Sequence, residues 1–254
     1  MRLMDFLERL RDVAGFLTII PVKKTDKATL INTADNMYLF PLLGGFIGLL
    51  AGGFGWCLLN LLPSIVIGAL TIGFILIFSG FHHTDGLLDF GDGLMVQGKP
   101  KEKISAMKDN RLGSGGFTLT LIIILLSIFS VSSIPQTILL QSLIVSEVSA
   151  KLSMVVLARI GRSAHEGSGK YFVDVLHRQH WQLRLTAAVG ISVILTIFLL
   201  GIIGVAVLTS GVVTSFVMLG IANRNFNGIT GDIFGATNEI SRMAALLTVL
   251  MVIR

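Results

Sequence analysis

Three aspartates stand close together in the stretch HHTDGLLDFGDG, from His82 to Gly93. On a helix, at about 100° per residue, Asp85, Asp89 and Asp92 fall at roughly 0°, 40° and −20°, on one narrow stripe. Three like charges so close raise one another's pKa values unless a cation lies among them. Mg²⁺ takes oxygen ligands and binds through carboxylates together with substrate phosphates. The stripe predicts a metal site, with a solvated helix end whose acids face water as the alternative.

A second acidic stretch, TGDIFGATNE, runs from Thr230 to Glu239. Asp232 and Glu239 are seven residues apart and share a helix face, with an offset of about −20°. Two acidic faces that enter a bilayer at one depth could converge on a shared metal site, as in metal-assisted phosphoryl displacement. The alternative for Glu239 is a polar contact inside the membrane, with Arg242 as its partner.

Between these stretches lies AMKDNRLGSGG, which carries an acid, a guanidinium and three glycines. Asp109 is a further candidate metal ligand, and the planar fork of Arg111 suits a phosphate. Gly113, Gly115 and Gly116 would let backbone amides approach an anion. A basic loop ended by glycine before the next apolar stretch is the equally good alternative.

Other polar side chains are candidates of a weaker kind. His82 and His83 abut the first aspartate, as hydrogen-bond partners, metal ligands or proton carriers. The i,i+4 pair Glu147 and Lys151 lies inside an apolar stretch, which predicts a mutually satisfied ion pair facing the bundle interior. Three basic residues further on could meet a nucleotide phosphate, namely Arg159, Arg162 and Lys170.

The elements that must position these residues are apolar helices. The chain is 53% hydrophobic and only 14% charged, and its mean hydropathy is +0.82. A soluble domain would carry roughly 25% charged residues. We therefore predict an all-α, polytopic membrane helix bundle forming a single domain over residues 1–254. About seven stretches have the length and apolarity of a span: 39–62, 64–82, 116–134, 137–158, 185–206, 208–223 and 233–253.

Basic residues alternate between the predicted loops. Six lie in the first 27 residues, five in 99–111 and five in 159–184, whereas the loops near residues 63, 134 and 209 have none. This alternation favours a cell-membrane protein whose N-terminus and motif-bearing loops are cytoplasmic. Seven spans would leave the C-terminus outside, which Arg254 fits poorly. The sequence has no basic stripe with interleaved aromatics, so it gives no indication of nucleic-acid binding. Homo-oligomerisation stays open.

The motifs resemble those of one family, the cobalamin synthases. GFHHTDGLLDFGDG is similar to the family pattern G-F-H-x-D-G-L-x-D-x-x-D-G, MKDNRLGSGG to M-x-D-S-R-x-G-x-x-G, and TGDIFGATNE to T-G-D-x-x-G-A-x-x-E. FLTIIPV and FPLLGGFIG also resemble family segments, in the family's order. Asn110 stands where the family commonly has Ser, and Thr84 where it usually has Leu.

The resemblance implies an integral membrane enzyme, adenosylcobinamide-GDP ribazoletransferase. Such an enzyme joins adenosylcobinamide-GDP to α-ribazole or its 5′-phosphate, forms adenosylcobalamin or its 5′-phosphate, releases GMP and needs Mg²⁺. Motif by motif, the implied metal ligands are Asp85, Asp89, Asp92, Asp232 and Glu239. The implied catalytic residues are Asp92, Asp109, Arg111 and Glu239, with Asp92 or Glu239 accepting the hydroxyl proton. The implied substrate-binding residues are His83, Arg111, Gly113 and Thr230.

Two other functions compete with this one. CDP-alcohol phosphotransferases also use clustered membrane aspartates, but in one continuous D-x-x-D-G-x-x-A-R…G-x-x-x-D-x-x-x-D stretch, whereas here the second acidic set lies about 140 residues after the first. A divalent-cation or proton-coupled transporter would spread its acids over several spans and show inverted repeats. Neither pattern is found here.

Overall fold

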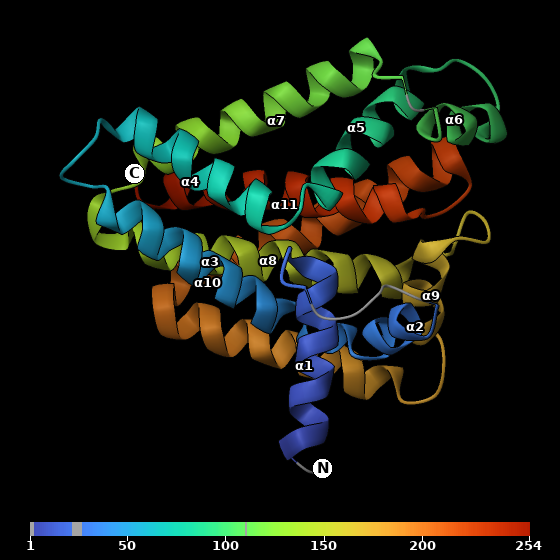
Figure 1. Ribbon diagram of the computed structural model, residues 1–254, viewed down its shortest axis with the longest axis horizontal. Coiled ribbons are helices and arrows are strands. Elements are labelled where there is room, and N and C mark those ends of the chain that lie inside the picture. Colours follow the sequence, from blue (N-terminus) through green and yellow to red (C-terminus); the bar gives the residue numbers. More distant parts are fainter. Residues whose placement is uncertain (1–2, 22–26, 110) are drawn as a thin grey trace.

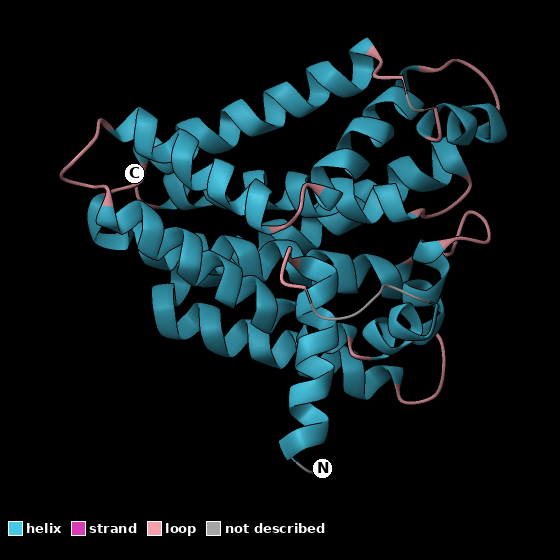
Figure 2. Ribbon diagram, in the orientation of Figure 1, coloured by secondary structure: helices cyan, strands magenta, loops and turns pink. Residues whose placement is uncertain are grey.

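The computed structural model describes residues 3–21, 27–109 and 111–254, and these residues form helices (Figures 1 and 2). The helices are α1 (Leu3–Leu17), α2 (Lys27–Asp35), α3 (Phe40–Cys57), α4 (Ser64–Phe78), α5 (His82–Met95), α6 (Pro100–Met107), α7 (Ser114–Ser133), α8 (Leu139–Ile160), α9 (Ser168–Val175), α10 (Trp181–Phe226) and α11 (Gly231–Val252), with short 3₁₀ turns η1 (Met37–Leu39) and η2 (Gln136–Ile138). The described part of the chain contains no strand, which confirms the all-α prediction.

Helix α8 is the centre of the bundle. Nearly all its residues from Ser142 to Ala158 are buried, and it packs against α3, α10 and α11. Glycines bring α3 close, because a Cβ at Gly44 would lie 2.5 Å from the carbonyl oxygen of Glu147, and one at Gly48 equally close to that of Leu143. This close approach is what small residues allow between membrane helices.

Three helices of the described chain have the length and apolarity to cross a membrane: Met37–Cys57, Ser114–Ser133 and Trp181–Phe226. A fourth is counted if α4 and α5, bent by 95°, form one broken span. Large apolar side chains face outward on these helices, with Phe198 87% and Trp56 62% exposed. Such a surface suits lipid, so the chain forms a helical membrane bundle. The seven predicted stretches fall on α3, α4, α7, α8, α10 and α11, and their number as membrane spans stays a prediction.

The predicted break between residues 206 and 208 is wrong, because the chain reverses earlier, at Gly201. This residue has φ 55° and ψ −127°, inside the stretch called α10. A Cβ at Gly204 would overlap the carbonyl oxygen of Thr196, although eight residues span about 12 Å in a straight helix. The two arms of α10 thus run in opposite directions, and Leu208 to Gly211 lie within the second arm.

The predicted stretch 64–82 ends sooner than expected. Helix α4 stops at Phe78, and the chain turns through Gly80 (φ 65°) and Phe81 (φ 59°). Helix α5 then leads away at 95° to α4. This turn gives the acidic motif a helix of its own, as its spacing predicts.

The motif-bearing segments gather at one end of the bundle. Figure 1 shows α6, α9 and the turn before α11 at the right, together with α2 and the end of α5. The α3–α4 connection and the C-terminus lie at the opposite end. The motif-bearing loops therefore share one end of the bundle, and the side of the membrane on which this end lies stays a prediction.

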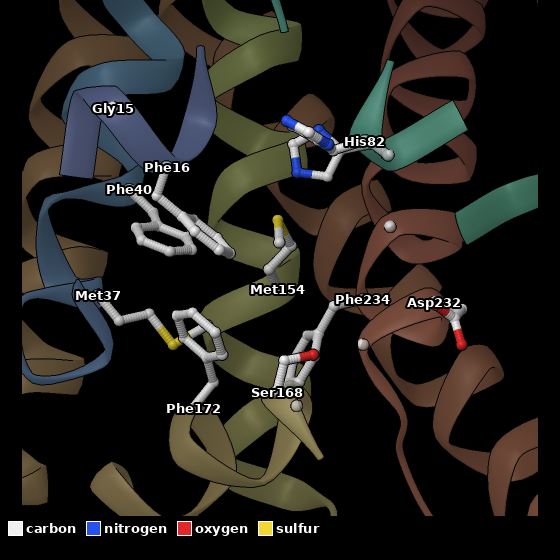
Figure 3. A pocket seen from close by; sticks show the side chains of 14 residues that line it. Gly15, Phe16, Met37, Phe40, His82, Met154, Ser168, Phe172, Asp232 and Phe234 are labelled. Atoms are coloured by element: carbon white, nitrogen blue, oxygen red, sulfur yellow. The ribbon is translucent and has the colours of Figure 1, made fainter. Parts of the chain in front are cut away.

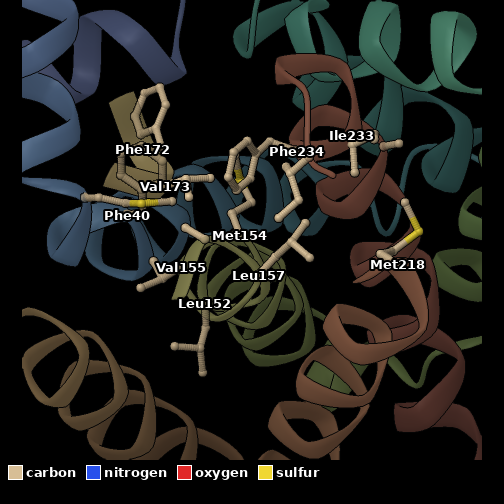
Figure 4. Packing of buried hydrophobic residues seen from close by; sticks show 14 of the residues in the cluster. Phe40, Leu152, Met154, Val155, Leu157, Phe172, Val173, Met218, Ile233 and Phe234 are labelled. Carbon is tan, nitrogen blue, oxygen red and sulfur yellow. The ribbon is translucent and has the colours of Figure 1, made fainter. Parts of the chain in front are cut away.

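The core nearest this end is aromatic and sulfur-rich. Phe40, Met154, Phe172 and Phe234 pack between α3, α8, α9 and α11 (Figure 4). Rings of Phe40 and Phe172 lie 5.9 Å apart, and those of Phe172 and Phe234 lie 6.1 Å apart. These contacts fix α9 and the start of α11 against α8.

Candidate active site

A polar cleft of about 710 Å³ opens at the motif-bearing end. Four segments line it: α5, the loop from Met107 to Leu112, the loop before α9, and the start of α11. Its lining residues are Asp85, Leu88, Asp89, Asp92, Met107, Lys108, Asp109, Arg111, Leu112, His165, Glu166, Gly167, Ser168, Thr230, Gly231 and Asp232. The cleft thus unites the three sequence motifs.

Four aspartates converge along this cleft, three from α5 and Asp232 from α11. The two helices nearly touch, since a Cβ at Gly86 would lie 2.9 Å from the carbonyl oxygen of Asp232. Partial burial, and then the charges of Asp232, Asp85 and Asp92, raise the pKa of Asp89 from 3.8 to about 7. Asp89 lies on α5, outside the predicted spans and on the open cleft. Because a bound cation would remove this repulsion, the carboxylates are suited to metal binding.

Asp92 also holds the start of α7 in place through hydrogen bonds. Its two carboxylate oxygens accept hydrogen bonds from the backbone amides of Gly113 at 2.8 Å and Gly116 at 2.7 Å. The glycine amides do approach an anion, as their spacing predicts, but the anion is a side chain of the protein. The predicted contact of Gly113 with substrate is therefore not one that this geometry prepares.

Asp109 and Arg111 form an ion pair on the rim of the cleft. Nη2 of Arg111 lies 2.7 Å from Oδ2 of Asp109, and Nε donates to both carboxylate oxygens. These hydrogen bonds from Arg111 lower the pKa of Asp109 to about 2. The Arg111 side chain is 89% exposed, so it can swing toward a diphosphate. Asn110 between them lies outside the described residues.

Thr230 caps α11 and connects it to the cleft. Its hydroxyl accepts a hydrogen bond from the amide of Ile233 at 3.3 Å, the usual N-cap arrangement. The same hydroxyl lies 3.4 Å from Oδ2 of Asp232. Just before it, Ile229 pairs with the backbone beside Ser163. This pairing draws the loop that precedes α9 to the mouth of the cleft.

Glu239 does not join the cleft aspartates. It is 3% exposed, and its Oε2 accepts a hydrogen bond from Nη1 of Arg242 at 2.5 Å. Arg242 also pairs with Glu147, whose second oxygen lies 3.6 Å from Nζ of Lys151. The predicted Glu147–Lys151 pair is thus present, within a four-residue network that also contains Glu239 and Arg242. A seven-residue spacing preserves the helix face but moves Glu239 about 10 Å along the axis, away from Asp232.

His83 lies on the far side of α5 from the cleft. It is 7% exposed and lines a second, smaller cavity. Within the described part of the chain, no group hydrogen-bonds to its Nδ1. Its predicted contact with substrate would therefore be made in that second cavity.

The cleft also contains residues that the sequence did not single out. His165, Glu166 and Ser168 come from the HEGSG segment, whose glycines follow α8 and could have indicated a turn beside the site. Lys108 adds a cation to the lining. The three basic residues expected to meet a phosphate do not line the cleft; Arg159, for example, lies over the ring of Trp181 at 3.8 Å.

The side chains of the cleft suit a partly hydrated ion such as Mg²⁺ better than an ion that the protein encloses completely. Among the described residues, no three histidine, cysteine or acidic side chains are arranged as a ready ligand set. Mg²⁺ usually keeps several waters and binds through one or two carboxylates plus substrate phosphates. A wide cleft with carboxylates along one wall and cations at its rim provides these conditions.

The comparisons with known proteins agree with the motifs. The model of the family described as cobalamin-5-phosphate synthase matches residues 9–250. Adenosylcobinamide-GDP ribazoletransferase of Methanocella arvoryzae is 34% identical, over 95% of each chain. The enzymes of the same name from Methanococcoides burtonii (31%, over 98% of this chain and 93% of the relative) and Thermococcus kodakarensis (32%, over 96% and 98%) are also similar. No solved structure matches the chain. The chain belongs to the cobalamin-5-phosphate synthase family.

Proposed function

We propose that this protein is an adenosylcobinamide-GDP ribazoletransferase. It joins adenosylcobinamide-GDP to α-ribazole or α-ribazole 5′-phosphate, with adenosylcobalamin or its 5′-phosphate and GMP as products. Family membership over residues 9–250 supports this reaction, as do relatives of that name at 31–34% identity. The observation that carries it is the cleft in which four aspartates from two distant segments meet.

The reaction exchanges one phosphorus–oxygen bond for another. A ribose hydroxyl oxygen of the acceptor attacks the phosphorus attached to cobinamide, the bond from that phosphorus to the GMP oxygen breaks, and the hydroxyl proton passes to a base. Negative charge develops on the leaving oxygen, so catalysis consists largely of positioning and charge neutralisation. Mg²⁺, when bound, would supply that neutralisation and hold the attacking and leaving oxygens in line.

The cleft carboxylates have distinct parts in this proposal. Asp85, Asp89 and Asp232 would hold Mg²⁺, because they line the cleft and the charges of Asp85 and Asp232 act on Asp89. Asp92 would complete this set and accept the hydroxyl proton, since each of its oxygens keeps one lone pair beyond the amide hydrogen bond it accepts. Glu239, the other candidate base, would instead orient Arg242, which pairs α11 with Glu147 of α8.

The cations of the rim would bind the diphosphate of the donor. The bonds of Arg111 to Asp109 use its Nε and Nη2, which leaves Nη1 for a phosphate oxygen. Lys108 lies in the same loop and lines the same cleft. A planar guanidinium and a mobile ammonium in one loop suit a diphosphate with several acceptor oxygens.

We also propose a multi-pass location in the cell membrane with the site on the cytoplasmic face. The basic segments around α6 and α9 lie at the end of the bundle that carries the cleft (Figure 1). Excess lysine and arginine in loops favours the cytoplasmic side, which is also where nucleotide substrates are found.

Turnover by the purified protein tests the function. In liposomes with adenosylcobinamide-GDP and α-ribazole, GMP and a new corrinoid should appear with Mg²⁺ and not in EDTA. Asp89→Asn should fold and insert but lose at least about 100-fold in rate. Asp174→Asn changes a partly exposed carboxylate on α9, outside the cleft, and should leave the rate unchanged. No GMP from well-inserted protein with either acceptor would refute the proposal.

A further inference from the structure

A second cavity of about 280 Å³ lies directly beside the acidic cleft. The two share a wall made by Ser168, Gly231 and Asp232. Figure 3 shows Ser168 and Asp232 beside this cavity, with the carboxylate of Asp232 pointing away from it. A molecule seated in the cavity could therefore extend past this wall into the cleft.

Aromatic rings and thioethers form the apolar part of the cavity lining. Phe16 from α1, Phe172 from α9 and Phe234 from α11 surround it, together with Met154 from α8 (Figure 3). The rings of Phe16 and Phe172 lie 5.2 Å apart. The polar side chains of the lining are those of the two histidines, Ser168 and Asp232. Flat aromatic molecules gain from such surroundings through ring stacking and sulfur contacts.

We propose that this cavity binds the aromatic base of the acceptor nucleoside, a bicyclic heterocycle carried on a ribose. This inference rests on the proposed function. The ribose hydroxyl must reach a phosphorus in the acidic cleft, so the base, one glycosidic bond away, must lie in an adjoining space. The cavity has room for a bicyclic ring but is far too small for a corrin macrocycle, which must lie elsewhere.

The guanine base of the donor is the competing occupant. Guanine carries several donors and acceptors along its edges, and burying them without partners is costly. The described lining of the cavity contains no arginine or amide side chain, and its one carboxylate, Asp232, points away. An alkylated bicyclic base loses little by entering such a site, whereas guanine is better served by the wide polar cleft.

Steady-state kinetics of pocket variants test this assignment. Phe16→Ala removes a ring from the cavity, and we expect the KM for α-ribazole to rise about tenfold, with the KM for adenosylcobinamide-GDP changed less than twofold. Phe74→Ala is the matched control, since Phe74 is also half-buried and stacks on two rings, those of Phe54 and Phe78, far from the site. It should change neither constant. A rise in the KM of the donor alone would assign the cavity to guanine and overturn the proposal.

A size-matched substrate adds a test that loss of fold cannot mimic. Met154→Phe narrows the cavity, so it should disfavour the riboside of dimethylbenzimidazole more than that of unsubstituted benzimidazole, shifting the ratio of their kcat/KM values about tenfold. Equilibrium dialysis with labelled α-ribazole should show a corresponding loss of affinity in Met154→Phe. An unchanged ratio and affinity, in a variant that still turns over, would refute the cavity assignment alone. Absence of turnover by the wild-type protein would refute the proposed function instead.

Discussion

Glu239→Gln separates a catalytic role for this residue from a structural one. Glu239, Arg242, Glu147 and Lys151 form a buried network of two acids and two bases, each at most 3% exposed. Oε2 of Glu239 accepts from Arg242 at 2.5 Å, and Oε1 accepts from Asn238 at 3.1 Å. The glutamine keeps the shape and one acceptor but removes a negative charge, leaving the network with one uncompensated positive charge.

The expected cost is large because the site is dry. Removing one partner of a buried ion pair typically destabilises a protein by about 3–5 kcal/mol. The retained amide oxygen can still accept from Arg242, so we expect the lower end, about 3 kcal/mol. For a chain of this size each kcal/mol moves Tm by roughly 2–4 °C. Glu239→Gln should therefore lower Tm by roughly 6–12 °C.

The assay is thermal unfolding in detergent, paired with a Mg²⁺ titration of GMP release below the transition. Glu239→Gln should lower Tm and leave the Mg²⁺ concentration for half-maximal rate unchanged. Asp174→Asn is the corresponding acid-to-amide change in a solvent-accessible ion pair, where the Asp174 carboxylate lies 4.0 Å from Arg178. It should leave Tm nearly unaltered. Adding Lys151→Met to Glu239→Gln restores a neutral network and should recover part of the loss.

A different outcome would indicate that Glu239 acts in the reaction. If Glu239→Gln keeps the wild-type Tm but requires tenfold more Mg²⁺, the carboxylate serves the metal and the structural reasoning is wrong. If Glu239→Gln with Lys151→Met loses more stability than the two single variants lose together, charge balance is not what stabilises the network.

Three further predictions concern the cleft. The raised pKa of Asp89, about 7, means that the metal-free folded protein binds more protons than the unfolded chain between about pH 4 and 7. The stability of the metal-free protein should therefore fall as pH rises through this window. Asp89→Asn should make this slope shallower in urea titrations without removing it, because burial also raises the pKa of Asp232. Apparent Mg²⁺ affinity should rise with pH up to about 7. Gly116→Ala should lower Tm by several degrees, because its Cβ would overlap the carbonyl oxygen of Leu88. The control Gly73→Ala has open space around its Cβ and should leave Tm unchanged. Equal Tm values for the two variants would contradict the close packing of α5 and α7. Arg111→Lys should raise the KM for adenosylcobinamide-GDP about tenfold with little change in Tm, since an ammonium cannot reproduce the guanidinium fork, and an unchanged KM would remove Arg111 from diphosphate binding.

Much of the architecture can be predicted from the sequence, because apolar length and periodicity are local properties. The long helices fall where the apolar stretches predict them, and the acidic motif of α5 forms the predicted helix. The errors lie at the turns. The reversal at Gly201 depends on one residue adopting φ 55°, and an apolar run carries no compositional signal for such a turn.

The sequence also determines the chemistry available to the site. Three acidic motifs in order, each with its glycines, indicate a family of membrane enzymes, and the match over residues 9–250 agrees. What the motifs contain is a property of residue type and spacing. For this reason the carboxylates, the guanidinium and the glycine-rich loop can all be identified from the sequence by itself.

Only the tertiary structure decided which of these residues meet. Asp232 joins the α5 aspartates because Gly86 lets α11 approach to van der Waals distance. Glu239, on the same face of α11 but about 10 Å further along it, pairs instead with Arg242, which also pairs with Glu147 of α8. The amides of Gly113 and Gly116 find Asp92, more than twenty residues earlier in the chain. Helical spacing fixes the angle around an axis, whereas the neighbours that a side chain meets depend on how separate helices pack.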